Sequence, residues 1–334
     1  MTSRELVVDT LEFRTPSRVP RQLWVLPWAE IYHPSELSRI RARFPDDIET
    51  CPSFFKVEPR TRGAEHRPGT FIDEWGCVFE NRQEGIIGEV KEPLVREWKD
   101  AESVRPPVER LSVDTGKVDD FCRSSAGFVL AGSKVRPFEQ TQFLRKPENL
   151  YMDLADPPDD LFRLIARVHG FFKEELELWA STEVDALFFA DDWGSQRSLL
   201  ISPALWRSLF KPLYREYVDI AHRNGKYAFM HTDGFITDIF PDLVEIGLDA
   251  VNAQLFCMDI EDLGRRFSGR ITFWGEVDRQ HILARGTRDD VFAAVERVRR
   301  ALDRRGGVIA QCEFGIGAAP GNVFSVFEAW ESRV

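Results

Sequence analysis

The residues with the clearest potential for chemistry lie in the stretch YAFMHTDG, from Tyr227 to Gly234. Its first five residues are mostly apolar and are typical of a buried strand that ends at His231. Asp233 and Gly234 follow directly before a helical pattern. Such an arrangement places an imidazole and a carboxylate at the carboxyl edge of a parallel sheet, where ligands and catalytic groups collect in α/β proteins. The stretch therefore predicts part of a functional site.

Other strand ends carry polar side chains that we expect at the same edge. They are Asp191, Asp192, Trp193 and Gln196; Asn252 and Gln254; Glu276 and Asp278; and Gln311, Cys312 and Glu313. Simpler roles compete with a functional one. Asp192 or Asp278 can cap the helix that follows it, and Asn252 with Gln254 can be polar packing inside the sheet. A lone cysteine such as Cys312 is more often a small buried apolar residue than a ligand.

Imidazole, thiol and carboxylate groups on one edge predict two kinds of chemistry. His231 and Asp233, with Cys312 and Glu313 at a corresponding height on another strand, form a candidate zinc site with an open position. Zinc lowers the pKa of a bound thiol or water and so makes a nucleophile at neutral pH. Without a metal, the same groups can act as general acid and base. The spacing leaves both interpretations open.

The elements that must position these residues alternate between strand and helix patterns from Phe128 onward. Strand patterns at 127–135, 186–194, 227–234, 248–256, 270–278 and 306–315 are each followed by a helical pattern. This order indicates right-handed βαβ units and a parallel sheet. With weaker strands at 21–26 and near 50–56, it predicts a closed (β/α)8 TIM-type barrel with an N-terminal helical segment, all in one domain spanning 1–334.

Residues 50–100 differ in texture from the rest, because apolar and polar residues alternate between glycines. We interpret this segment as a β-hairpin excursion that covers one end of the site. No strand is followed by G-x-G-x-x-G, and no G-x-x-x-x-G-K-[ST] occurs, so the usual nucleotide-binding signals are missing.

The composition narrows the class of partner. The 334 residues carry a net charge of −11, which argues against nucleic acid and anionic membranes as partners. The five cysteines are scattered without a C-x-x-C pair, as expected of reduced thiols. Neither a signal-peptide pattern in the first 13 residues nor a membrane-spanning apolar run is visible. We expect a cytoplasmic enzyme for a small molecule, as a monomer or a homodimer.

Four segments of this chain resemble the uroporphyrinogen decarboxylase superfamily, and more specifically its corrinoid-linked methyltransferase branch. The segment that begins DDWGSQRSLLISP is similar to the family's D-D-x-G-x-Q-x-x-x-x-(I/M)-S-P block, and HTDGFITDIFPDLVEIG to its H-x-C-G block. ITFWGEVD resembles the G-x-(I/V)-D strand, and GGVIAQCEFGIGAAPGNV the final strand, where the methyltransferases place a cysteine. The resemblance covers most of the chain, is strongest from Asp191 onward, and implies a TIM-type barrel.

The resemblance also implies which residues act. The methyltransferases bind zinc through His-x-Cys and a late cysteine; here His231 matches the histidine, Asp233 replaces the first cysteine, and the late position falls on Glu313 or Cys312. Zn²⁺ and a methyl-corrinoid donor, with a corrinoid protein as partner, follow as expectations. The segment RQLWVLPWAEIYHP lacks the Arg-Gly-rich motif that binds carboxylates in the decarboxylases, so the resemblance does not extend to porphyrinogen decarboxylation.

Three functions remain open from the sequence. The first is a methyltransferase-like enzyme with His231, Asp233 and Glu313 or Cys312 as metal ligands. The second is a metal-free decarboxylase or lyase of a small acid, and the third a non-catalytic barrel that binds a small ligand or a corrinoid protein. In the enzymatic hypotheses the catalytic residues are Asp191, Asp192, His231, Asp233 and Glu276, and the substrate-binding residues are Trp28, Trp75, Trp193, Gln196, Asn252, Gln254 and Asp278.

Overall fold

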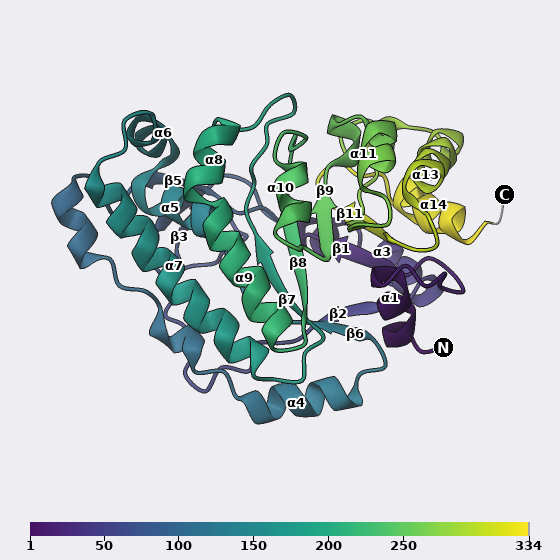
Figure 1. The fold of residues 1–334 in the computed structure, drawn as a ribbon, viewed down its shortest axis with the longest axis horizontal. Coiled ribbons are helices and arrows are strands. Elements are labelled where there is room, and N and C mark those ends of the chain that lie inside the picture. The colour runs from purple at the N-terminus through teal and green to yellow at the C-terminus, as the bar shows by residue number, and fades with distance from the viewer. Residues whose placement is uncertain (333–334) are drawn as a thin grey trace.

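A computed structural model describes residues 1–332 of the chain as a parallel barrel with an outer layer of helices (Figure 1). Eight parallel strands follow the order β1-β11-β10-β9-β8-β7-β6-β2. Their bounds are β1 Arg21–Val25, β2 Ile48–Thr50, β6 Phe128–Leu130, β7 Ala186–Ala190, β8 Tyr227–Thr232, β9 Ala250–Ala253, β10 Thr272–Trp274 and β11 Val308–Phe314. The order confirms the TIM-type barrel, and β2 lies slightly before the predicted strand near 50–56.

Helices surround the barrel between the strands. They are α1 Ser3–Leu11, α2 Pro27–Tyr32, α3 Pro34–Arg43, α4 Thr115–Ser124, α5 Pro137–Arg145, α6 Pro147–Ala155, α7 Asp159–Ala180, α8 Pro203–Leu209, α9 Lys211–Arg223, α10 Phe240–Glu245, α11 Ile260–Phe267, α12 Ile282–Arg285, α13 Arg288–Leu302 and α14 Pro320–Glu331, with short 3-10 helices at Trp98–Ser103, Val108–Leu111 and Leu255–Cys257. The long helices α7 and α9 lie side by side over β7 and β8 (Figure 1). Pro at the first turn and Ser202 as N-cap begin α8, as its sequence predicts.

The barrel interior is filled by large side chains, because alternate residues of each strand point inward. Phe128, Phe229, Trp274 and Ile309 form one buried cluster, joined by Leu11 of α1. Helix α1 contacts β2, β6 and β11, so it covers the end of the barrel where the strands begin. The opposite, carboxyl end of the strands remains for the site.

Two strands of the barrel meet without a hydrogen-bonded ladder, and we call this junction, formed by β1 and residues 46–53, the seam. One backbone bond and two aspartate side chains take the place of the ladder. Asp47 N–H donates to Arg21 C=O at 2.9 Å, and Arg21 N–H donates to Asp47 Oδ2 at 2.9 Å. Leu23 N–H donates to Asp46 Oδ1 at 2.7 Å. The barrel is therefore nearly closed, with two aspartates holding its last junction.

The excursion in residues 50–100 contains three strands instead of a simple hairpin. β3 Gly69–Ile72, β4 Val78–Asn81 and β5 Glu89–Glu92 form an antiparallel sheet in that order. The segment TFIDEWGCVFEN already forms a hairpin by itself, and the following segment adds β5. Gly85, between β4 and β5, has a φ of +85°, and a Cβ there would lie 2.6 Å from Trp28 Cα. The excursion thus touches the chain directly after β1.

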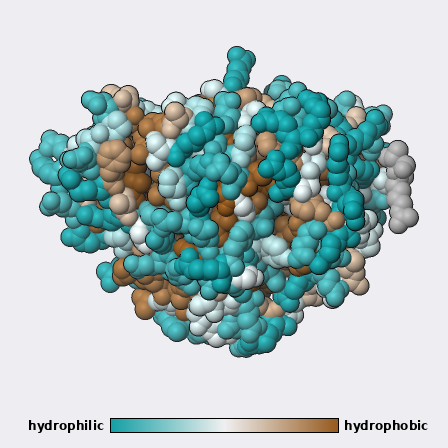
Figure 2. Space-filling model, viewed as in Figure 1, coloured by the Kyte–Doolittle hydropathy of each residue, from teal (hydrophilic) through white to brown (hydrophobic). Residues whose placement is uncertain are grey.

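The surface in Figure 2 is mainly hydrophilic, with apolar side chains visible in smaller patches between polar ones. Among residues 1–332, no helix combines the length and apolarity that crossing a lipid bilayer requires.

Candidate functional site

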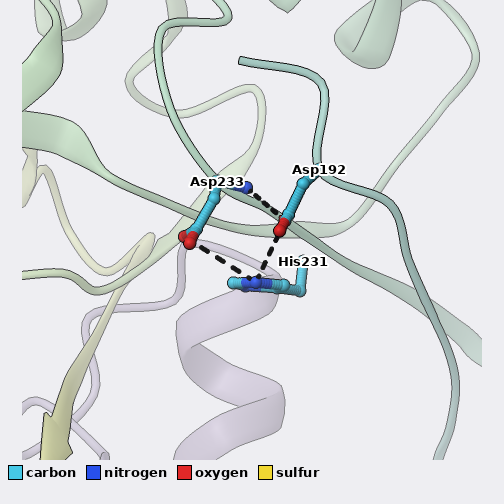
Figure 3. Close-up of side chains that lie close together, drawn as sticks. All are labelled: Asp192, His231 and Asp233. Atoms are coloured by element: carbon cyan, nitrogen blue, oxygen red, sulfur yellow. Dashed lines mark hydrogen bonds and ion pairs between the residues drawn. The ribbon is translucent and has the colours of Figure 1, made fainter. Parts of the chain in front are cut away.

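Three potential ligand groups converge at the carboxyl ends of β7 and β8 (Figure 3). His231 Nε2, on β8, lies 3.6 Å from Asp192 Oδ1 and 3.8 Å from Asp233 Oδ1. Asp192 follows β7 and Asp233 follows β8, so the parallel pairing of Ala190 with His231 brings them together. The predicted strand-end site is therefore formed by neighbouring strands, with Asp192 beside the His-x-Asp motif.

Hydrogen bonds fix the orientation of all three groups. His231 Nδ1 lies 2.6 Å from Asn252 Oδ1, and the Asn252 amide nitrogen donates to the carbonyl of Trp274. Because the amide oxygen can only accept, Nδ1 carries the proton and Nε2 faces the two aspartates. Asp233 N–H donates to Asp192 Oδ1 at 2.9 Å. The site is oriented before any ligand arrives.

The aspartates also set the protonation of the imidazole. Burial lowers the pKa of His231, but the nearby Asp192 and Asp233 carboxylates outweigh burial, and the net pKa is raised. In the protonated imidazolium the second proton sits on Nε2. A metal bound at Nε2 would have to displace this proton, so the apparent metal affinity would increase with pH.

Arg279 supplies the positive charge among the surrounding carboxylates. Its guanidinium pairs with Asp233 Oδ2, with Glu313 Oε1 at 2.7 Å and with Glu276 Oε2 at 3.5 Å. Burial, together with Asp233 and Glu313, raises the pKa of Glu276 to about 8, although Arg279 acts in the opposite direction. Arg279 occupies one oxygen of Asp233 and leaves Oδ1 buried without a hydrogen-bond partner among residues 1–332.

Glu139 adds another carboxyl to the same pocket. It lies in the first turn of α5 and, with Asp192 and His231, lines a cavity of 1090 Å³. Burial and the Asp192 charge raise the pKa of Glu139 to about 7, and Arg136 opposes this effect. A carboxyl that titrates near neutral pH can accept or donate a proton.

Two pockets flank the site. The larger, which we call the seam pocket, is the 1090 Å³ cavity and contains Trp24, Phe188 and Trp274 beside His231. The smaller, which we call the side pocket, has 170 Å³ and lies beside Glu276 and Arg279.

The structure brings most of the predicted site residues into this region. Asp192, His231, Asp233, Asn252, Glu276 and Glu313 belong to one connected network. Gln196 Nε2 donates to Gln254 Oε1 at 3.0 Å, and both line the side pocket with Asp278. Asp278 Oδ1 also accepts from the backbone N–H groups of Gln280 and His281. These bonds lie in the turn before α12, whose N-cap residue is His281, so Asp278 is not the helix cap considered from the sequence.

Other predicted site residues serve the framework. Asp191 is fully buried and accepts hydrogen bonds from Phe138 N, Glu139 N and Tyr214 Oη at 2.9, 2.7 and 2.5 Å. It anchors the start of α5, unlike its neighbour Asp192. These contacts place Asp191 under the first turn of α5, which carries Glu139.

The three predicted tryptophan walls differ in position from the seam pocket's own aromatic residues. Trp193 is fully buried and stacks on Phe138 at 4.1 Å. Trp75 packs in the core against Phe171 at 5.2 Å. Trp28 lies at the rim, in contact with Gly85. Trp24, from the same segment as Trp28, is the one that reaches His231, at 5.1 Å between ring centroids.

The predicted ligand set needs one correction. Cys312 is fully buried in an apolar cluster with Leu23 and Phe327, outside the barrel wall. Neighbouring residues of a strand point to opposite faces, so Glu313 faces the mouth while Cys312 faces the helices. Glu313 in turn is paired with Arg279. The residue that completes a set with His231 and Asp233 is Asp192.

Sequence reasoning missed Arg279 and Glu139. Arg279 directly follows the polar strand end GEVD, and that position was the available signal. Glu139 follows Pro137, which begins α5, so a strand-to-helix boundary pointed to it. In both cases the signal was local, whereas Asp233 and Glu313, which pair with Arg279, and Asp192 and His231, which line the pocket with Glu139, come from other strands.

The fold and the site define a (β/α)8-barrel protein with a carboxylate- and imidazole-rich site at the carboxyl ends of its strands. The family model described as "Uroporphyrinogen decarboxylase (URO-D)" matches residues 73–332. The chain belongs to this family, as the sequence resemblance indicated. Membership supports an enzyme.

A solved methyltransferase structure agrees with the fold. A methyltransferase from Methanosarcina mazei is similar to this chain with a TM-score of 0.68 and 14% identity, covering 99% of this chain and 98% of that one. The apo form of 3-keto-D-glucoside 4-epimerase from E. coli gives a TM-score of 0.40 and 12% identity, covering 72% and 95%. The search of curated proteins gave no match.

Proposed function

We propose that this chain is a methyltransferase-type enzyme that acts on a small molecule at a divalent metal held by Asp192, His231 and Asp233. The observation that carries the proposal is the convergence of their three ligand atoms within 4.8 Å of one another. Family membership and the structural likeness to a methyltransferase support the reaction class.

The residues present fit a metal ion. Asp233 Oδ1 is buried without a partner among the described residues, and Nε2 of His231 faces it. Separations of 3.6 and 3.8 Å from Nε2 are close to the roughly 3.3–3.5 Å between ligand atoms of tetrahedral zinc. One imidazole and two carboxylates form a harder set than cysteine thiolates, so it accepts zinc and other divalent ions.

The chain's residues have separate tasks in this reaction. A divalent ion held by these residues would supply Lewis-acid activation of the acceptor. Glu139 takes the acceptor's proton as the bond from the acceptor to the methyl carbon forms and the bond from that carbon to the donor breaks, with its electron pair left on the donor. Asn252 keeps His231 turned toward the acids, and Arg279 keeps Asp233 Oδ2 occupied. The donor we propose is a methyl-corrinoid presented by a partner protein.

Metal analysis tests this proposal first. Protein purified without chelator and then dialysed against zinc should contain about one ion per chain. His231→Ala and Asp192→Asn should lose the ion, whereas Cys312→Ala, as matched control, should keep it. No metal in the wild type after zinc is offered would overturn the proposal, and so would metal loss in the control.

A metal-free lyase or decarboxylase is the second candidate, and Arg279 is the observation that favours it. Its guanidinium already provides a cation beside Glu276, whose pKa of about 8 suits a proton donor. This candidate predicts turnover of a small acid that persists in excess chelator and is lost in Glu276→Gln. Turnover that requires added metal would exclude it.

A further inference from the structure

The seam pocket is shaped by the missing ladder between β1 and β2. It is lined by Trp24, which faces the barrel interior, and by Leu23, which faces the outer helices. Ile48 and Ser53 line it from the other side of the seam. Residues from both faces of β1 therefore border one cavity of 1090 Å³, large enough for a drug-sized molecule.

An aromatic wall runs along this pocket to the site. The Trp24 ring lies 5.1 Å from Trp274, 6.3 Å from Phe188 and 5.1 Å from His231, measured between centroids. Leu130 belongs to the same lining. Such a wall suits a planar apolar body placed with one end at His231.

Two cations lie on the loop between β6 and α5, at the border of the same pocket. Lys134 and Arg136 both line it, and neither forms an ion pair with any residue from 1 to 332. Both also border the smaller pocket that contains Asp73 and Glu74, whose carboxylates they attract over a longer distance. Four acidic residues also line the pocket: Asp46 and Glu49 on the β2 side, and Asp192 and Glu139 at the site. Asp46 is engaged by Leu23 N–H. Lys134 and Arg136 are therefore the cationic part of a border whose other charges are acidic.

We propose that the seam pocket binds a small molecule with an anionic group and a planar apolar body. The anionic group, whether carboxylate, phosphate or sulfonate, pairs with Lys134 and Arg136. The body lies along Trp24, and the reacting end reaches His231 and Asp192. This assignment of a substrate class rests on the proposed function for its reacting end, but binding itself requires neither metal nor turnover.

A matched pair of fluorescent probes separates charge from apolar contact. 8-Anilino-1-naphthalenesulfonate carries a sulfonate, and N-phenyl-1-naphthylamine has the same rings without it. Both are titrated into the full-length protein in the presence of EDTA. Wild type should bind the sulfonate probe more tightly, and added salt should weaken only that probe.

Variants then locate the binding. Lys134→Gln with Arg136→Gln should weaken the sulfonate probe roughly tenfold and leave the neutral probe unchanged, as expected for lost ion pairs. Trp24→Ala should weaken both probes, with Trp24→Phe as the milder substitute if the alanine variant does not fold. Lys117→Gln with Arg304→Gln, two exposed cations away from the pocket, is the matched control.

Equal effects of the two double variants would overturn the proposal, and so would equal losses for both probes in the Lys134/Arg136 variant. Because the titrations contain EDTA, they can succeed when the metal analysis fails, or fail when it succeeds. The two proposals are therefore tested independently.

Discussion

The two sides of the barrel mouth are built in different ways. At β7 and β8, five backbone pairs from Ala186 to Ala190 hold the strands together, and β8 pairs equally directly with β9. At the seam, Asp46 and Asp47 carry contacts that a backbone ladder makes elsewhere. The paired side holds His231 and both aspartates in fixed positions, whereas the unpaired side contains the cavity. In this barrel, the proposed reacting groups therefore lie on the hydrogen-bonded side, and the cavity that could bind a ligand lies on the side without a ladder.

Removal of the Asp47 carboxylate should have the largest effect on the seam. Arg18 binds it through two nitrogens at 2.6 and 2.7 Å, and Ser3 Oγ and Arg21 N also donate to it. Its side chain is 1% exposed. Asp47→Ala should lower the free energy of unfolding by about 2–4 kcal/mol, since buried donors lose their acceptor. Urea unfolding measures the change.

The matched control for Asp47→Ala is an exposed acid in a similar pair. Asp120 binds Arg123 on α4 with 78% of its side chain exposed. Asp120→Ala should change the unfolding free energy by less than about 1 kcal/mol. Similar losses for both variants would show that the seam does not depend on its aspartate.

On the β7–β8 side, Asn252→Ala tests the orientation of His231, because it removes an orienting contact without opening the barrel. The 2.6 Å contact to His231 Nδ1 is lost, so the imidazole can rotate away from Asp192. Zinc affinity should fall about 10–100-fold, the usual cost of losing an outer-shell partner of a ligating histidine. Competition with a chromogenic chelator measures it. Gln254→Ala, at the same strand end but bonded to Gln196, should leave affinity unchanged.

The smallest effect concerns Asp46 and depends on pH. Burial raises the pKa of Asp46 to about 6, while the Leu23 N–H bond lowers it. A raised folded-state pKa contributes stability below the unfolded value near 3.8 and loses it as the pH rises through about 6. Asp46→Asn should therefore be neutral at pH 4 and stabilise by on the order of 1–2 kcal/mol at pH 8. Thermal unfolding at both pH values is the check, and equal effects at pH 4 and pH 8 would contradict it.

The barrel and the edge that carries the site could be predicted from the sequence, because both depend on local patterns. Apolar strands followed by polar ends and amphipathic helices identified β7 to β11 and placed His231 and Asp233 correctly. The resemblance left Cys312 and Glu313 as alternative late ligands. Strand alternation on β11 places Cys312 among the outer helices, while Glu313 pairs with Arg279. Asp192, which completes the set, follows a neighbouring strand, and only the pairing of β7 with β8 brings it to His231.

Long-range partners explain the remaining differences. Asp191 and Asp192 are chemically identical neighbours, and only the position of α5 makes one a helix anchor and the other a member of the site. Arg279 was overlooked because its three acidic partners come from separate parts of the chain. The third strand of the excursion was missed because a single hairpin was assigned to residues 50–100, although TFIDEWGCVFEN alone forms both β3 and β4.

Arg279 also limits how the mouth can change shape. It links Asp233 after β8, Glu276 after β10 and Glu313 on β11 through one guanidinium. Outward movement of any of these strand ends would separate charges that are largely shielded from water. A variant that accepts a bulkier molecule is therefore easier to obtain by trimming side chains along the seam than by altering the β8–β11 edge, and this directs substrate engineering to Leu23, Ile48 and Ser53.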